Sequence, residues 1–409
     1  MVTAERVDWE EKIRIAREIG KRAQQQRRSF DDDAVFPTEV FKEIRAAGLH
    51  TMGIPEDRGG LGMWQRNSYK PYYRVLEALA EGDSSVSQMV QITTHASGIA
   101  CGLGNDSQQA FYTDQVINHG ALMSSVGSEA HPGMKTPEVY QSELRREGDG
   151  KYHLSTRKAF ASLAPAADFW VLWVAMEGEG TFADRLTFAV VPNGTPGTKL
   201  VDDWDTLGMR ATISQSLEIK DLVVPDEWIV GQPGDWMTKD PRTFTLAYAA
   251  NHIGTAQGAL NFAIDYIKER EYLQKDPVTM TAIGDMSCQL WSVRQALYSA
   301  ADEWERGEDY DRAELNGMRT LHVAKQAALS VVYRLFDVLG ARVTFRAYPL
   351  EQALRDIRTF TLHFRDDAYM QIVAGADLGQ PFLAKGSRTG SSPGGAKPHL
   401  HSGNLDAVG

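Results

Sequence analysis

The chain has 409 residues, of which 43% are hydrophobic and 24% charged, and its formal net charge is −11. This composition is typical of a globular protein long enough for two or three sub-domains, and it excludes a disordered chain. The acidic balance argues against nucleic acid as a partner, because a polyanion is bound through clustered cations and the lysines and arginines here are scattered.

The first residues, MVTAERVDWEEKIR, are charged and lack the apolar core of a signal peptide. No stretch reaches the roughly 20 apolar residues that a membrane helix needs. We therefore expect a cytoplasmic protein with no membrane partner. Cys101 and Cys288 lie far apart without a C-x-x-C spacing, so we expect neither a metal site nor a disulfide, and we interpret both as buried small hydrophobic residues.

Residues 1–120 are predicted to form an N-terminal α-helical domain. Apolar residues recur at near-helical spacing over 13–19, and Pro37 stands at the start of another helix. A glycine-rich turn at 57–62 interrupts the pattern. Helical periodicity then resumes over residues 71–79 and 84–103.

Residues 121–235 show a different pattern, which predicts a middle β domain, a barrel or sandwich. Short runs rich in Val, Phe, Trp and Leu, such as 169–175 (FWVLWVA) and 186–191 (LTFAVV), are separated by Gly, Asp and Pro.

Residues 236–384 are predicted to form a C-terminal four-helix bundle. Its helices are expected at residues 248–270, 278–306, 312–339 and 350–363. Residues 385–409 are rich in Gly, Ser and Pro without an apolar period, so we expect a tail that is mobile or wrapped by a partner.

The fold class predicted from this order of elements is α+β. No G-x-G-x-x-G follows a predicted strand, and no G-x-x-x-x-G-K-[ST] occurs. The chain is therefore not expected to bind NAD(P)H itself.

Four segments, in the same order along the chain, resemble motifs of the acyl-CoA dehydrogenase superfamily. They are residues 54–62 (IPEDRGGLG), 81–85 (EGDSS), 205–212 (DTLGMRAT) and 348–356 (YPLEQALRD). The resemblance covers most of the chain and implies that superfamily's fold, in which a small β domain lies between two helical ones.

The last predicted helix ends differently from that of the dehydrogenases. In those enzymes the following turn reads Tyr-Glu-Gly, and the glutamate removes an α-proton from the substrate. The corresponding residues here are His363, Phe364 and Arg365. A phenylalanine cannot accept a proton, so the resemblance implies a flavin scaffold without that base.

Two segments resemble the two-component flavin-dependent monooxygenases of the superfamily, the branch that includes dibenzothiophene monooxygenase. They are residues 355–363 (RDIRTFTLH) and 158–168 (KAFASLAPAAD). This resemblance implies oxidation of a small organic substrate by O₂ and reduced flavin, through a C4a-hydroperoxyflavin. It further implies a separate NAD(P)H:flavin reductase as partner, and a homotetramer.

The same resemblance implies three catalytic residues, His95, Ser162 and His363. Each residue has a structural interpretation as well. His95 could be a satisfied core histidine, Ser162 a serine that caps the end of a strand, and His363 a cap that compensates the helix dipole. The pKa of an unperturbed histidine lies near neutrality, so His363 could act as general acid or base. His252, at the start of a bundle helix, is a weaker candidate.

Six residues are predicted to bind the flavin: Ser128, Ser162, Arg210, Arg270, Arg355 and Thr359. For Arg210 the alternative is a local ion pair, and for Ser128 an ordinary loop serine. The R-x-x-F-G and Q-x-x-G-G motifs that hold the pyrophosphate and adenine of FAD in the dehydrogenases are missing. We therefore expect FMN, and FAD is less favoured.

Two alternative functions stay open. The first is an acyl-CoA dehydrogenase that oxidises a thioester with a relocated base, which predicts tightly bound FAD and no need for O₂. The second is a catalytically inactive scaffold of the same fold. The sequence does not select a substrate, since a sulfur heterocycle, phenol, amine or amino sugar would fit equally.

Overall fold

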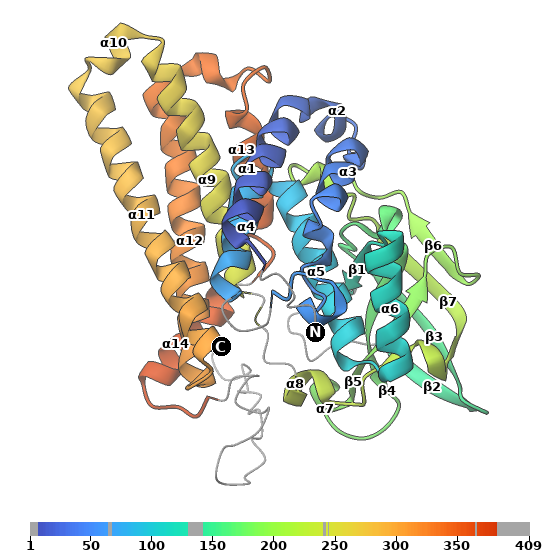
Figure 1. The fold of residues 1–409 in the computed structure, drawn as a ribbon. Helices are drawn as coiled ribbons and strands as arrows, with labels where there is room; N and C mark the ends of the chain where they lie inside the picture. The colour runs from blue at the N-terminus through green and yellow to red at the C-terminus, as the bar shows by residue number, and fades with distance from the viewer. Residues whose placement is uncertain are drawn as a thin grey trace, which may run out of the picture.

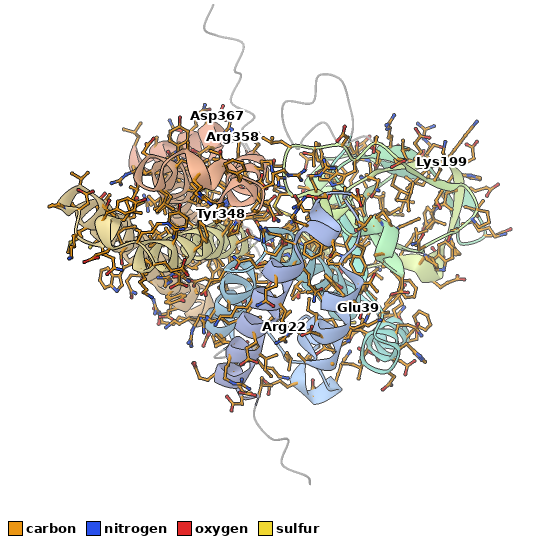
Figure 2. The ribbon with its side chains drawn as sticks, turned by 90° about the horizontal axis from the view of Figure 1, so that it is seen from above. Arg22, Glu39, Lys199, Tyr348, Arg358 and Asp367 are labelled. Carbon is orange, nitrogen blue, oxygen red and sulfur yellow. The ribbon has the colours of Figure 1, made fainter. Side chains whose placement is uncertain are left out.

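The computed structural model describes residues 7–63, 68–129, 142–239, 243, 245–364 and 366–382. Figure 1 shows three parts side by side: a bundle of long helices, a central group of N-terminal helices, and a β-sheet. Figure 2 shows the same arrangement from above, with Lys199 at the outer edge of the sheet and Arg22 on the N-terminal helices.

Three of the N-terminal helices described, α1, α5 and α6, begin at a residue whose side chain caps the helix. The Asp8 carboxylate accepts the Glu11 N–H, and Asn105 forms a capping box with Gln108. The helices are α1 (Trp9–Gln26), α2 (Arg28–Asp31), α3 (Thr38–Ala46), α4 (Tyr69–Ala80), α5 (Ser84–Leu103) and α6 (Asp106–His119).

The middle part is a sheet of eight strands in the order β6-β7-β3-β2-β4-β5-β8, with β1 pairing in parallel with β4. Its strands are β1 (Met123–Val126), β2 (Glu143–Gly148), β3 (Lys151–Lys158), β4 (Phe169–Met176), β5 (Leu186–Pro192), β6 (Thr198–Val201), β7 (Ser216–Pro225) and β8 (Ile229–Val230). The short helices α7 (Phe182–Arg185) and α8 (Asp235–Lys239) accompany it. Strand β5 is buried over Leu186–Val191, which explains its continuous apolar sequence.

The C-terminal part is helical and has its own apolar core. Its helices are α9 (Thr245–Lys268), α10 (Glu271–Gln274), α11 (Pro277–Arg306), α12 (Tyr310–Leu339), α13 (Leu350–Phe360) and α14 (Asp366–Asp377). Leu260 of α9, Leu290 of α11 and Leu335 of α12 are buried together there. None of the helices among the described residues combines the length and apolar character needed to cross a membrane.

The structure confirms the predicted α+β fold with helical, sheet and helical parts in that order, and it corrects two details. Cys101 is buried as expected, whereas Cys288 is exposed on α11. Helix α13 ends at Phe360 and not near His363, because the next amides bond three residues back, Leu362 N–H to Thr359 O and His363 N–H to Phe360 O. The predicted tail, 385–409, lies outside the described residues.

Candidate active site

Helix α5 is buried along most of its length although many of its side chains are polar. Ser84, Gln88, Gln91 and His95 follow one another at spacings of four, three and four, so they share one face of the helix. The Oε1 atom of Gln88 and both amide atoms of Gln91 make no hydrogen bond within the described part of the chain. Buried amides are normally paired, so this face has the character of a ligand site.

Helix α9 faces the start of α5 with polar side chains of its own. Ser84 Oγ donates to Asn251 Oδ1 at 2.7 Å, and Asn251 Nδ2 donates to the Ser84 carbonyl at 2.9 Å. One helical turn before Asn251 and His252 lies Tyr248, which is buried. Burial raises the pKa of Tyr248 above its usual range, and Gln88 opposes this shift, so the Gln88 amide lies near the Tyr248 hydroxyl.

His363 lies directly after α13 within a cluster of aromatic rings. Its Nε2 is 2.7 Å from the Tyr248 hydroxyl, and the two rings stack with centroids 4.5 Å apart and an interplanar angle of 28°. The Phe364 ring is 4.8 Å from the imidazole and nearly perpendicular to it. Phe364 therefore belongs to an aromatic cluster.

The surroundings of His363 favour the neutral imidazole. Burial among the rings and, to a smaller extent, the charge of Lys325 together lower the pKa of His363 to about 4. The residue keeps exposed surface, and water at that surface offsets part of the burial effect. The direction is supported by the geometry, because the contacts are aromatic and the nearby charge is positive.

His252 is a second histidine held neutral beside this cluster. It is 1% exposed, and its ring lies 5.0 Å from Phe360. Burial, followed by the nearby Lys325 and His363, lowers the pKa of His252 to about 3. Its Nδ1 has no hydrogen-bond partner among the residues that the structure describes. A buried nitrogen of this kind is available to a ligand.

Ser162 lies in a turn after β3 and is held from both sides. Its N–H donates to the Phe160 carbonyl at 2.9 Å, and its carbonyl accepts the Ser124 hydroxyl at 2.7 Å. Its own hydroxyl lies 2.8 Å from the hydroxyl of Ser214, which is buried in the turn before β7. The side chain is therefore well positioned before any ligand binds.

These two neighbouring turns contain backbone conformations that most residues avoid. Positive φ angles occur at Phe160 (52°), Leu163 (69°), Met209 (56°) and Ile213 (42°). For a β-branched residue such as Ile213 this is an outlier, and such strain concentrates at functional sites. The turns are joined by the Leu163 N–H, which donates to the Thr212 carbonyl at 2.8 Å.

Contacts made by α5 link the surroundings of Ser162 to those of His363. Thr93 Oγ1 accepts the N–H of Met123 at 3.0 Å, so α5 contacts β1, and β1 holds Ser162 through Ser124. His95, 2% exposed, shares a helix face with Gln88, whose neighbour Tyr248 bonds His363. His95 thus lies on α5 itself, whereas Ser162 is linked to this helix through β1 and His363 through Tyr248.

The three arginines predicted to bind the flavin make other contacts in the structure. Arg210 donates to the backbone carbonyls of Asp31 and Asp32, at 2.8 and 3.1 Å, and so joins the sheet to α2. Arg355 pairs with Asp31 at 2.8 Å. Arg270 lies 3.4 Å above the Tyr266 ring. These contacts fit the structural interpretation, and a role of these arginines at the flavin stays a prediction.

Two polar candidates have hydroxyls with no hydrogen bond given by the structure. The Oγ1 atom of Thr359 is buried and unbonded within the described residues. Ser128 is half-buried, and its carbonyl accepts the Ala159 N–H at 2.9 Å. Both hydroxyls could serve a ligand, so their predicted role is compatible with the structure.

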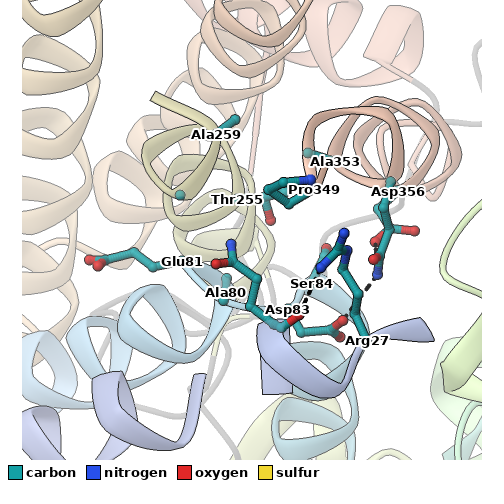
Figure 3. Close-up of a pocket in the computed structure, with 14 residues that line it drawn as sticks. Arg27, Ala80, Glu81, Asp83, Ser84, Thr255, Ala259, Pro349, Ala353 and Asp356 are labelled. Carbon is teal, nitrogen blue, oxygen red and sulfur yellow. Dashed lines mark hydrogen bonds between the residues drawn. The ribbon is translucent and has the colours of Figure 1, made fainter. Parts of the chain in front are cut away.

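A small cavity of about 20 Å³ marks the junction of the parts (Figure 3). Asp83 and Asp356 both line it, and Gln352 Nε2 donates to both carboxylates, at 3.1 and 3.3 Å. Burial raises the pKa of both groups, to about 6 for Asp83; the charge of Asp31 raises both pKa values further, and that of Asp83 also raises the pKa of Asp356. Asp356 Oδ1 also accepts the Met209 N–H at 2.6 Å, which anchors the strained turn to α13.

Sequence reasoning missed several residues of this site: Tyr248, Gln88, Gln91, Ser214 and Thr212. A signal for Tyr248 existed, because Tyr248, Asn251, His252 and Thr255 interrupt an otherwise apolar helix at helical spacing. Among the described residues, no group of three or more His, Cys, Asp or Glu is arranged to hold a metal ion.

Family models match all three parts of the chain. Those of the N-terminal, middle and C-terminal domains of acyl-CoA dehydrogenase match residues 11–119, 126–222 and 246–367. The chain belongs to the acyl-CoA dehydrogenase family.

Its relatives include monooxygenases as well as dehydrogenases. The dibenzothiophene monooxygenase of Mycolicibacterium goodii is 25% identical over 380 residues, covering 86% of this chain and 89% of the relative. FMN-bound TdsC of Paenibacillus sp. A11-2 matches with a TM-score of 0.82 and 23% identity, over 92% of this chain and 100% of that one. Butyryl-CoA dehydrogenase of Megasphaera elsdenii matches with a TM-score of 0.80 and 21% identity, over 91% of this chain and 98% of that one.

The site fits a flavin by its own chemistry. A flavin ring combines an apolar face with a polar edge, and it suits a pocket of aromatic rings with a few fixed polar groups. The Gln91 amide, which makes no hydrogen bond among the described residues, and the hydroxyl of Ser162 are polar groups of this kind. The neutral histidines His252 and His363 add two more beside the aromatic cluster of Tyr248 and Phe360.

Proposed function

We propose that this protein is a flavin-dependent monooxygenase that uses reduced FMN and O₂ to hydroxylate or heteroatom-oxidise a small organic substrate. The observation that carries the proposal is the aromatic cluster around His363, which includes Phe364. The resemblance of the sequence implies that Phe364 stands where the dehydrogenases have their glutamate base. The similarity to dibenzothiophene monooxygenase and to FMN-bound TdsC supports it. When bound, reduced FMN would supply the oxygen chemistry, as a C4a-hydroperoxide.

The chain's own residues would have three tasks. His363, neutral at pH 7, would accept a proton from the substrate or donate a hydrogen bond from whichever nitrogen carries the hydrogen. Tyr248 would hold the imidazole in place through the 2.7 Å hydrogen bond. The Phe360 and Phe364 rings would exclude water.

His95 and Ser162 would bind the cofactor from the other side of the site. Ser162 is rigid and half-buried, as a contact to the flavin edge requires. His95 projects from the polar face of α5. Ser128, Thr359, Arg210, Arg270 and Arg355 would assist in holding FMN.

Partners and assembly form the rest of the proposal. A separate NAD(P)H:flavin reductase would supply reduced FMN in the cytoplasm, since the chain has no nicotinamide-binding motif. A homotetramer is supported by large apolar side chains exposed on α11 and α12, including Trp291 and Tyr333, which are 62% and 66% exposed.

The test is to add photoreduced FMN anaerobically and then admit oxygen. We expect a transient absorbance from an oxygen adduct of the flavin. When several thiophenes, phenols and amines are then supplied with ¹⁸O₂, we expect the product of one of them to contain ¹⁸O. Tight FAD binding with oxidation of an acyl-CoA thioester in the absence of oxygen would overturn the proposal in favour of a dehydrogenase. Failure to perturb the flavin spectrum would indicate an inactive scaffold.

A further inference from the structure

The hydroxyl of Ser162 is the first of three hydroxyls that form a chain of hydrogen bonds ending at a backbone carbonyl. Ser162 Oγ lies 2.8 Å from Ser214 Oγ, which lies 2.7 Å from Thr212 Oγ1. Thr212 Oγ1 in turn lies 2.7 Å from the carbonyl oxygen of Met209. Thr212 and Ser214 are 2% and 3% exposed, so water does not compete for these contacts.

The carbonyl at one end fixes the direction of every hydrogen bond in the chain. A carbonyl oxygen only accepts, so Thr212 must donate its single hydroxyl hydrogen to Met209. Between Thr212 and Ser214, Thr212 Oγ1 must therefore be the acceptor, and Ser214 donates its hydroxyl hydrogen to it. Ser214 can consequently only accept from Ser162.

The hydrogen of the Ser162 hydroxyl is therefore committed to Ser214. Toward any ligand on its other side, Ser162 offers lone pairs and no hydrogen. Ser162, predicted from the sequence to bind the flavin, would therefore bind it as a hydrogen-bond acceptor. The backbone of Ser162 is held by Phe160 and Ser124, and its hydroxyl is held by the hydrogen bond to Ser214.

We propose that Thr212 and Ser214 are positioning residues that make Ser162 a hydrogen-bond acceptor, and that the site thereby selects reduced over oxidised flavin. Reduced flavin carries a hydrogen on N5, whereas N5 of oxidised flavin is itself an acceptor. An acceptor beside N5 bonds the first and repels the second. The inference rests on the proposed function, because it needs a flavin N5 at Ser162.

The experiment compares the Kd of oxidised FMN with that of photoreduced FMN under anaerobic conditions. Thr212→Val keeps the shape of the side chain but removes the donor to Met209, so the Ser162–Ser214 pair can reverse. We expect the ratio of the two Kd values to fall about five-fold, the worth of one neutral hydrogen bond. Thr212→Ser keeps the donor and should retain the wild-type ratio.

The outcomes separate this inference from the function on which it rests. If Thr212→Val binds FMN with the wild-type ratio, the inference is wrong although the flavin site stands. If the wild-type protein binds FMN in neither state, the proposed function fails, and the inference with it. Thermal unfolding shows whether Thr212→Val folds. If it does not, Ser214→Ala is used in its place. This variant also frees the Ser162 hydrogen, so the ratio of the Kd values of oxidised and reduced FMN should fall by a similar factor.

Discussion

The hydroxyl of Tyr248 lies 2.7 Å from Nε2 of His363, and their rings stack 4.5 Å apart, although 115 residues separate them in the sequence. This pair joins the first helix of the C-terminal part to the turn after α13. It makes the position of the imidazole depend on α9.

Replacing His363 by alanine should abolish coupling between flavin oxidation and product formation while leaving the fold intact. A positioned acid or base contributes about 10²–10⁴-fold to a rate, so product per reduced FMN should fall at least ten-fold and H₂O₂ should rise. Product and peroxide are measured together. His153→Ala, at an exposed histidine paired with Glu147, is the matched control. Wild-type coupling in His363→Ala would remove His363 from the catalytic residues.

Tyr248→Phe should keep the stacked ring and lose only the hydrogen bond to His363. We expect coupling to fall by about ten-fold, the effect of one hydrogen bond to a reacting group, with FMN affinity unchanged. The pH profile of product formation should change in the same variant, because the environment of the imidazole changes. An unchanged profile and unchanged coupling would show that the pair is structural.

His252→Gln should make the protein less sensitive to acid. The pKa of His252 is about 3 in the folded protein and about 6.5 when unfolded, so the unfolded state binds the proton more readily. The stability that the neutral ring contributes is fully present above pH 6.5 and is lost as the pH falls toward 3. At pH 5 the loss is about 2 kcal/mol.

Urea unfolding of the wild type and His252→Gln at pH 7.5 and pH 5.0 measures this difference. The decrease in the free energy of unfolding between the two values should be smaller in the variant. An equal decrease in both proteins would contradict the expectation. His153→Gln, at an exposed position, controls for the general effect of removing a histidine.

Gly208→Ala should destabilise the protein, because a Cβ atom at this position would lie 2.2 Å from the carbonyl oxygen of Arg355 on α13. Relieving such an overlap costs about 1–3 kcal/mol and displaces the turn that carries Thr212. Gly284→Ala, in the middle of α11 with no atom within 4 Å, should instead stabilise by about 0.5–1 kcal/mol. Thermal unfolding of both variants tests the contrast. Equal melting temperatures would refute it.

The fold could be predicted from the sequence because its elements have clear periods and boundaries. The helix expected at 84–103 is observed as α5, and the strand expected at 169–175 is β4. The end of α13 was harder to predict, since the tightening of its last turn depends on contacts made by His363 and its neighbours. Cys288 was predicted buried from residue type alone, and its place on an exposed helix face overrode that preference.

The candidate site was only partly predictable. His95, Ser162 and His363 were found through motifs, and their catalytic roles stay predictions. Tyr248 was missed because a tyrosine in an apolar helix usually belongs to the core. Thr212 and Ser214 could not be found, because their importance lies in a chain of hydrogen bonds whose geometry depends on two strained turns.

The polar face of α5 has a consequence for the order in which the molecule assembles. The Ser84 side chain finds its partner in Asn251, 167 residues further along the chain. Before α9 is synthesised, Asn251 does not exist, and the polar side chains at the start of α5 stay hydrated. Hydrophobic collapse alone would not bury these side chains. The polar contacts at the start of α5 are therefore expected to form only after α9 has emerged, whereas its apolar side chains can pack earlier against α4.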